Sequence, residues 1–256
     1  MIHAAAGTLA AIVLAVMAVP ARADDTIKTE IVKTSGGDLV IHPFHHASMM
    51  LSWNGIAILV DPAPPTGGSE ADDPSAEYKA AATPDLILVT HEHGDHFSAA
   101  ILEAVAGAGT ALVAPKSVAD KMPDDLKAKT TVMANGDSGT VKGVAIEAVP
   151  AYNTTPDRTK FHPQGRDNGY VLTLGDKRIY IAGDTEDTPE MKALESIDVA
   201  FLPMNLPYTM DIEHAAQAVK DFKPKVVYPY HYGESDVSAF KEMVGDDAEV
   251  RLLKWY

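Results

Sequence analysis

The stretch Asp85-Leu-Ile-Leu-Val-Thr-His-Glu-His-Gly-Asp-His96 decides the fold and directs the search for function. Its first half is a continuous apolar run, which is typical of a strand buried on both faces of a sheet. Its second half places His91, His93, Asp95 and His96 directly after that strand. We interpret this pattern as a metal-binding loop on a rigid strand; the alternative is a histidine-rich turn in solvent.

Two further apolar runs end in side chains that bind metal ions. Asp184 follows Ile179-Tyr-Ile-Ala-Gly183, and His231 follows Val226-Val-Tyr-Pro-Tyr230. A single histidine after a strand is more often a core residue, but potential ligands at several strand ends are what a preformed site at a sheet edge requires. The carboxylate of Asp184 is suited to bridge two cations.

The elements around these runs occur in the same order in both halves of the chain. Asn54-Gly55 and Gly175-Asp176 separate apolar runs and predict hairpins. Strands that alternate with helices then follow, with helices expected at residues 75–82, 98–106, 117–122, 189–194 and 211–222. Residues 62–74 are predicted to form a long loop. This order fits an α/β fold in which two sheets pack face to face with helices outside, a four-layer αββα sandwich.

The composition excludes several classes of protein. With 46% hydrophobic and 22% charged residues among 256, the chain is globular, and disordered, coiled-coil and polytopic membrane proteins are excluded. A formal net charge of -15 disfavours binding to nucleic acid. The chain contains no cysteine, so a metal ion would be bound by His, Asp, Glu or Asn.

The N-terminal segment is interpreted as a targeting signal. Residues 9–19 are all apolar, a run shorter than the roughly 20 residues that span a bilayer. Ala21-Arg22-Ala23 follows as a small-x-small cleavage site, so residues 1–23 are predicted to be a secretory signal peptide. Residues 24–256 would then form a single domain in the periplasm or outside the cell, without membrane contact. The alternative is an uncleaved anchor.

These motifs resemble a known family. His91 to His96 is the HxHxDH signature of the metallo-β-lactamase superfamily, and Gly183-Asp184 and His231 are similar to its later ligand motifs. Further segments resemble the branch of ascorbate-6-phosphate lactonase-like proteins and metal-dependent hydrolases; they are His46-Ala-Ser, Asp61-Pro62, Phe161-His162-Pro163, Ala182-Gly-Asp-Thr185 and Pro229-Tyr-His231-Tyr-Gly. The resemblance covers about Leu39 to Gly233.

The resemblance implies a set of ligands for two metal ions. The first ion would be bound by His91 and His93, the second by Asp95, His96 and His231, and Asp184 would bridge them. Many relatives have a third histidine for the first ion where this chain has Ala151-Tyr152-Asn153. Either Asn153 replaces it, or His162 reaches in from the following loop. We favour His162, because imidazole binds transition metals better than an amide oxygen does. An enzyme with one metal ion is the alternative.

Three other residues have two interpretations each. Asp61 either orients the HxHxDH loop as a hydrogen-bond acceptor or caps a turn. His46 resembles a residue near the pocket of relatives, but a buried structural histidine is equally expected. Tyr208 follows a strand and either lines a substrate pocket or packs within its loop.

The expected chemistry is hydrolysis of a small-molecule ester, lactone or phosphodiester. Two divalent ions, Zn²⁺ foremost and Mn or Fe as alternatives, would share a bridging hydroxide that attacks the substrate. Asp95 would orient that hydroxide and pass a proton to the leaving group, and Asp184 would hold the two ions together. The alternatives are an iron-dependent oxidoreductase on the same fold and a non-catalytic periplasmic metal-binding protein.

Overall fold

The computed structural model describes residues 29–66 and 73–256. The predicted signal peptide, residues 1–23, lies outside these residues, and so does the middle of the predicted loop at 62–74. In the described part of the chain, no helix has the length and apolar character needed to cross a membrane.

Two seven-stranded sheets form the centre of the molecule. The first contains, in spatial order, β1 (Glu30–Thr34), β2 (Gly37–Pro43), β3 (Met49–Trp53), β4 (Ile56–Val60), β5 (Leu86–Leu88), β6 (Ala111–Ala114) and β7 (Thr130–Val132). The second contains β14 (Glu249–Val250), β13 (Val226–Tyr230), β12 (Val199–Pro203), β11 (Lys177–Ile181), β10 (Asp167–Leu174), β9 (Val144–Ala151) and β8 (Ser138–Val141). Each strand therefore pairs with its neighbours in the chain.

Both sheets change from antiparallel to parallel pairing along their width. Strands β1 to β4 are antiparallel and β4 to β7 are parallel. Strands β8 to β11 are antiparallel and β11 to β14 are parallel. The two halves thus repeat the same order, as the sequence predicts. Because parallel strands run in one direction, their carboxyl ends meet at one edge of the sheet, where ligands bind in α/β folds.

The two predicted hairpins are confirmed. Asn54 and Gly55 connect β3 to β4 with φ angles of 48° and 77°. Both angles are positive, as a type I′ turn requires, and the twist of that turn matches the twist of the flanking strands. Gly175, with a φ of 65°, lies in the turn between β10 and β11.

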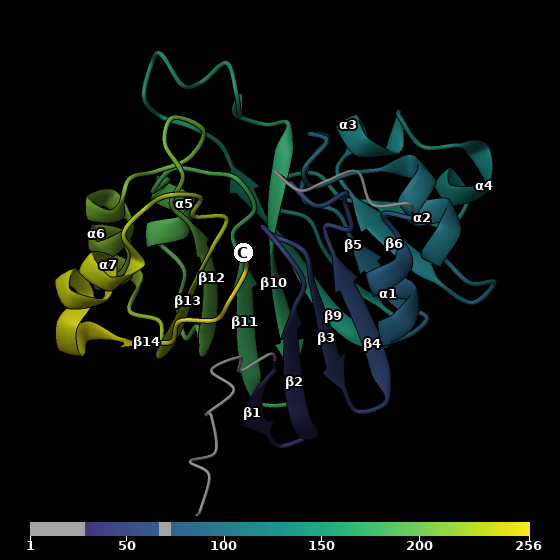
Figure 1. Cartoon of the computed structure of the whole chain (residues 1–256), viewed down its shortest axis with the longest axis horizontal. Coiled ribbons are helices and arrows are strands. Elements are labelled where there is room, and N and C mark those ends of the chain that lie inside the picture. The colour runs from purple at the N-terminus through teal and green to yellow at the C-terminus, as the bar shows by residue number, and fades with distance from the viewer. Residues whose placement is uncertain (1–28, 67–72) are drawn as a thin grey trace, which may run out of the picture.

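Helices cover the outer face of each sheet, on opposite sides of the molecule (Figure 1). The first sheet carries α1 (Ala76–Ala81), α2 (Ala99–Val105), α3 (Lys116–Ala119) and α4 (Asp124–Lys127), and the second carries α5 (Pro189–Lys192), α6 (Ile212–Phe222) and α7 (Val237–Val244), which a 3₁₀ turn (Gly245–Asp247) follows. The predicted α/β fold, a four-layer αββα sandwich, is confirmed.

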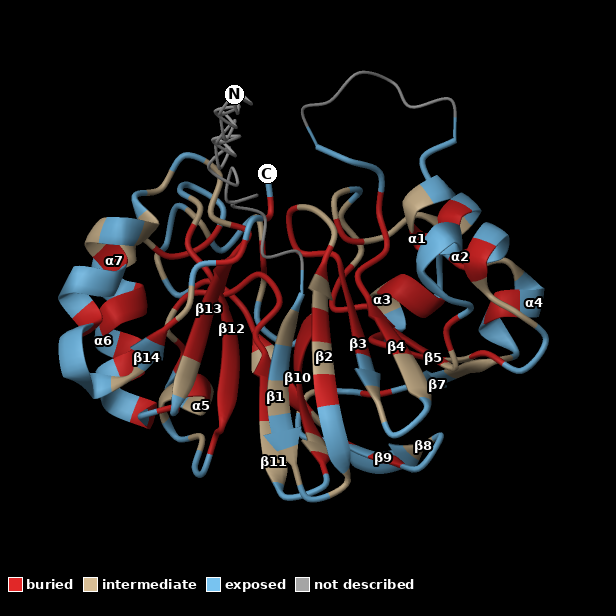
Figure 2. Cartoon of the chain, turned by 60° about the horizontal axis from the view of Figure 1, so that its bottom comes forward, coloured by how far each residue is buried: buried red, intermediate tan, exposed pale blue. Residues whose placement is uncertain are grey.

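Three apolar layers join these elements. The largest lies between the sheets, where Leu51 of β3 belongs to one buried cluster with Leu172 of β10 and Phe201 of β12. A second cluster packs α5, α6 and α7 on the second sheet, and a third packs α1 to α4 on the first. Figure 2 shows that the strands of the centre are mostly buried, whereas the helices expose their outer faces. The core therefore fixes the strand ends that position the site.

We expect the central layer to set the stability of the fold. Phe201 is fully buried, and its ring stacks on that of Tyr228 with 5.2 Å between centroids. The substitution Phe201→Ala leaves a cavity between the sheets and should lower the free energy of unfolding by about 3–5 kcal/mol. Urea denaturation measures this loss. Ile31→Ala, on a side chain that is 53% exposed, is the control and should change it by less than about 0.5 kcal/mol. Equal losses would contradict this packing.

Candidate metal centre

The HxHxDH loop lies between β5 and α2 and is fixed at both ends. At its start, Asp61 from the end of β4 accepts hydrogen bonds from the backbone N and the Oγ1 of Thr90, both at 2.7 Å. At its end, the side chain of Ser98 accepts from Ile101 N and caps α2. Within the loop, the backbone N–H groups of His96 and Phe97 both donate to His93 O.

Asp184 lies at the centre of the site, at the end of β11. The carboxylate is 2% exposed, and four histidine Nε2 atoms surround it. The distances to its oxygens are 3.8 Å from His91, 3.3 Å from His96, 3.3 Å from His162 and 3.2 Å from His231. These histidines come from both sheets, so the sandwich has to form before they meet.

Gly183 allows the chain to enter this position. It has a φ of 66°, and a Cβ there would lie 3.0 Å from Asn168 O and 3.1 Å from Thr90 Cβ. A side chain at this residue would therefore be strained in its backbone and would press on the start of the HxHxDH loop. The close approach brings Asp184 beside the histidines of that loop.

The potential ligand atoms form overlapping groups. Within each group, all the atoms lie within 4.8 Å of one another; the groups are His91, His93 and His162; His46, Asp95, His96 and His231; and His91, His96 and Asp184. The last group overlaps both of the others. This arrangement suits two neighbouring cations with a carboxylate between them.

Hydrogen bonds on the far side of the imidazoles orient their Nε2 atoms. Nδ1 of His96 lies 2.8 Å from Asp61 Oδ2, and Nδ1 of His162 lies 3.1 Å from Asp167 Oδ2. Nδ1 of His91 lies 3.0 Å from Thr90 Oγ1, which itself donates to Asp61. With Nδ1 as the donor in each ring, Nε2 keeps a lone pair that faces Asp184.

The residues present fit a metal centre. Among the described residues, the buried atoms that have no hydrogen-bond partner include Nε2 of His91, Nε2 of His96, both ring nitrogens of His231 and Oδ1 of Asp184. Buried polar atoms are rarely left unpaired, because their desolvation is costly. Imidazole and carboxylate are also the donors that Zn²⁺, Mn²⁺ and Fe²⁺ accept from proteins.

His162 and Asn153, the two candidates for the third ligand of the first ion, have different surroundings. His162 Nε2 faces Asp184 and groups with His91 and His93. The Nδ2 of Asn153 donates to Arg158 O and to Tyr208 O, and its backbone N donates to His162 O at 2.9 Å. Asn153 Oδ1 is buried without a partner. Asn153 therefore fixes the loop that carries His162.

The charges of the cluster are strongly coupled. Burial raises the pKa of Asp184, but the neighbouring His231 and His96 lower it well below its usual value. Burial lowers the pKa of His231, but the negative charge of Asp184 and the nearby carboxylate of Asp95 raise it to about 9. Burial and His96 together lower the pKa of His91 well below its ordinary value. Without metal, the cluster thus retains protons that a cation has to displace.

Asp95 occupies the exposed side of the centre. Its side chain is 34% exposed, and its Oδ2 lies 3.1 Å from His46 Nε2 and 3.6 Å from His231 Nε2. His46 is buried, and its Nδ1 lies 3.0 Å from the phenol of Tyr256. The phenol of Tyr256 also accepts from Gly233 N at 3.1 Å. His46 therefore connects Asp95 to the segment that follows β14.

A cavity of about 670 Å³ opens over the centre. His93, His162, Asp95, Asp184 and His46 form its floor. Phe161, Tyr208, Asn205, Gly233, Glu234, Tyr256 and Thr66 form the rest of its lining. Tyr208 thus faces the cavity, and its volume suits a small molecule.

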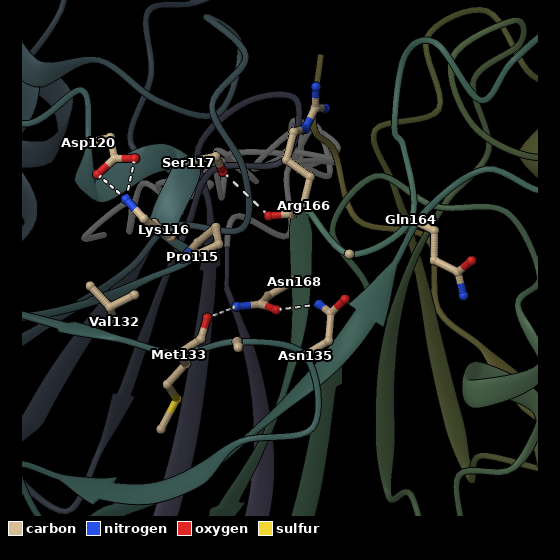
Figure 3. Close-up of a pocket in the computed structure, with 12 residues that line it drawn as sticks. Pro115, Lys116, Ser117, Asp120, Val132, Met133, Asn135, Gln164, Arg166 and Asn168 are labelled. Carbon is tan, nitrogen blue, oxygen red and sulfur yellow. Dashed lines mark hydrogen bonds and ion pairs between the residues drawn. The ribbon is translucent and has the colours of Figure 1, made fainter.

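A second cavity, of about 390 Å³, lies behind Arg166 and contains no ligand atom of the cluster. Its polar groups bind one another: Asn135 donates to Asn168, Asn168 donates to Met133 O, and Lys116 pairs with Asp120 (Figure 3). We therefore assign the chemistry to the cavity over Asp184.

Comparison with known proteins identifies the family. The chain matches the family described as Beta-lactamase superfamily domain over residues 40–231. It is 37% identical over 206 residues to a UPF0173 metal-dependent hydrolase of Pyrococcus abyssi, covering 77% of this chain and 88% of that protein. The chain belongs to this metal-dependent hydrolase family of the metallo-β-lactamase superfamily.

Solved structures agree with this assignment. A protein from Parabacteroides distasonis described as a metal-dependent hydrolase is 44% identical to this chain. The two structures align with a TM-score of 0.79, over 88% of this chain and 99% of the Parabacteroides chain. The metallo hydrolase Igni18 of Ignicoccus hospitalis is 26% identical, with a TM-score of 0.68 over 84% of this chain and 95% of Igni18. The predicted superfamily is thus confirmed, whereas the ascorbate-6-phosphate lactonase branch stays a prediction.

Three residues of the site were not identified from the sequence. Thr90 and Asp167 orient histidines, and Tyr256 orients His46. Thr90 adjoins the HxHxDH loop and Asp167 starts a strand after His162, so both positions carried a weak signal. Tyr256 carried none, because it lies far along the chain from every motif.

Metal binding by this hydrolase should release protons. His231, with a pKa of about 9, is protonated at about pH 7.5 in the metal-free protein, and a cation binds only the neutral ring. The apparent affinity for Zn²⁺ should therefore rise with pH up to about 9. Calorimetry in buffers of different ionisation enthalpy measures the number of protons released when Zn²⁺ binds. We expect at least about one proton per chain.

His214→Ala is the matched control, because His214 is exposed on α6 and pairs with Asp211 outside the cluster. It should leave the proton count unchanged. Zn²⁺ affinity that does not vary with pH across this interval would contradict the assignment of His231.

Proposed function

We propose that this hydrolase binds two divalent metal ions, Zn²⁺ foremost and Mn or Fe as alternatives, and hydrolyses a small-molecule ester, lactone or phosphodiester. The observation that carries the proposal is the group of buried, unpartnered atoms around Asp184. Burying one carboxylate among four imidazoles is costly without further compensation. Two cations that bind those atoms would offset that cost.

The ligand groups divide the residues between two sites. His91, His93 and His162 would bind one ion, and Asp95, His96 and His231 would bind the other, with Asp184 between them. When bound, the ions supply Lewis-acid chemistry, which polarises a carbonyl or phosphoryl group and makes water nucleophilic near neutral pH.

Asp95 is the group of this chain that can move the proton. In hydrolysis, the oxygen of water bonds to the carbonyl carbon or to phosphorus, the bond to the leaving alcohol breaks, and the alcohol oxygen gains a proton from water. Asp95 lines the cavity, and its exposure allows it to accept that proton and donate it again. Burial raises its pKa, but the neighbouring His231 and the hydrogen bond to His46 lower it below its usual value, so the carboxylate starts as the base.

His46 positions Asp95 for this role. The imidazole contacts Asp95 Oδ2 on one side and the phenol of Tyr256 on the other. Its backbone is fixed as well, because His46 N donates to Trp255 O and His46 O accepts from His231 N. Its φ of 55°, rare for a residue with a side chain, is consistent with a functional constraint.

Export of the protein belongs to the same proposal. Residues 1–23 would direct the chain to the periplasm or the exterior. The negative net charge of the chain disfavours nucleic acid as a substrate.

The proposal is tested by activity with and without metal. The protein as purified should hydrolyse p-nitrophenyl esters or bis(p-nitrophenyl) phosphate, lose that activity to a chelator, and regain it with Zn²⁺, Mn²⁺ or Fe²⁺. Asp184→Asn should lower kcat by about a thousandfold or more, because it removes the charge between the ions. Asp187→Asn, which changes a carboxylate paired with Lys192, is the control and should keep activity within about threefold.

Two outcomes would replace the proposal. Turnover that consumes O₂ and needs a reductant would indicate the iron-dependent oxidoreductase. Bound metal with no turnover of any ester, lactone or phosphodiester would indicate the non-catalytic metal-binding protein.

A further inference from the structure

Beyond the potential metal ligands, the wall of the cavity contains three aromatic side chains. Phe161, Tyr208 and Tyr256 line it, and the rings of Phe161 and Tyr208 meet edge to face with 5.2 Å between centroids. Each ring comes from a different segment: the loop before β10, the loop after β12, and the segment after β14. The fold thus brings three rings to one opening from distant parts of the chain.

Two of these rings are unusually exposed. Tyr208 is 46% exposed and Tyr256 is 47% exposed, and Leu206 in the same loop as Tyr208 is 46% exposed. Large apolar side chains that gather in solvent around an opening mark a binding surface, because burying them there is favourable. An aromatic or aliphatic ring of a ligand would cover them.

Among the described residues that line the cavity, none is a lysine or an arginine, and Glu234 adds a negative charge at the mouth. An anionic group of a substrate would therefore lack a cationic partner in this wall.

The nearest basic side chains have other partners. Arg166 donates to both carboxylate oxygens of Asp167 and to Phe161 O, and its Nη2 lies 3.4 Å from His93 Nε2. Arg158 pairs with Glu186 at 2.9 Å. The Nζ of Lys160 lies over the Phe161 ring, 5.0 Å from its centroid, and Lys160 does not line the cavity.

We propose that the substrate is an uncharged ester or lactone that carries an apolar ring, rather than a phosphodiester or a phosphorylated lactone. The inference rests on the proposed hydrolase function and narrows its substrate class. The ring of the substrate contacts Tyr208 and Tyr256, and its carbonyl lies over the metal ligands. Glu234 and the absence of basic groups in the described lining disfavour substrates with a negative charge at the far end.

The test compares three esters of p-nitrophenol with the metal-loaded protein. All three share the p-nitrophenyl leaving group and differ in the acyl group: phenylacetyl is neutral and carries a ring, acetyl is neutral and small, and hemisuccinyl carries a carboxylate. After division by the rates in buffer alone, kcat/KM should be at least about tenfold higher for the phenylacetate than for either other ester. Bis(p-nitrophenyl) phosphate should be the poorest substrate.

Variants distinguish the effect of the Tyr208 ring on substrate preference from the effect of the Glu234 charge. Tyr208→Ala should raise KM for the phenylacetate about tenfold with little change in kcat, and Tyr208→Phe should restore it, because the ring makes the contact. Glu234→Lys should raise the ratio of hemisuccinate to phenylacetate turnover about tenfold. Lys160→Ala is the control and should change neither the KM for the phenylacetate nor the ratio of hemisuccinate to phenylacetate turnover.

The inference would be overturned if the protein prefers the hemisuccinate or the phosphodiester and Lys160→Ala abolishes that preference. Metal-dependent hydrolysis would remain intact in that case. If no probe is hydrolysed, the proposed function fails, and binding decides the inference. The uncharged ligand N-benzylacetamide should then bind the metal-loaded protein, and Tyr208→Ala should weaken that binding about tenfold. Absence of binding, or binding insensitive to Tyr208, would overturn it.

Discussion

The structure depends on one buried carboxylate. Asp184 lies among the Nε2 atoms of four histidines that come from both sheets, and three of them, His96, His162 and His231, lie within 3.3 Å of its oxygens. Such a group has no stable place in an apolar core unless its charge is compensated. The sandwich therefore brings together a negative charge and the imidazole nitrogens of four histidines at the edge where its parallel strands end. This requirement accounts for the tight turn at Gly183 and for the buried hydrogen bonds behind the histidines.

Those hydrogen bonds fix the orientation of the ligand side chains. Asp61 supports both ends of the HxHxDH loop, because it accepts from Thr90 at the start and from His96 at the end. Three residues of the site have positive φ angles: Asp61 (44°), His46 (55°) and His231 (45°). Their side chains lie beside His96, Asp95 and Asp184, respectively. Strained backbone of this kind persists only where the surrounding structure stabilises it. We infer that part of the stability from the core is used to keep the ligand atoms in place.

Much of this was predictable from the sequence. Apolar runs that end in His91 or Asp184, and turns such as Asn54-Gly55, depend on local patterns, so they predicted the central strands, the hairpins and the layers correctly. The surroundings of His162 and the contact of Tyr256 with His46 depend on how loops distant in the chain fold over the sheet edge, and no local pattern encodes that. Helices α4 and α7 and the short strands β7 and β14 were not predicted. The two strands have three and two residues, and pairing with β6 and β13 defines them.

The central claim is that Asp184 joins two metal ions, and metal content per folded chain tests it most directly. Elemental analysis of the protein should give about two ions per chain. Asp184→Asn should retain fewer than about one, His162→Ala should fall toward about one, and Asn153→Ala should stay near two. One ion in the unaltered protein, unaffected by Asp184→Asn, would contradict the account. Loss of an ion in Asn153→Ala but not in His162→Ala would show instead that the amide is the ligand.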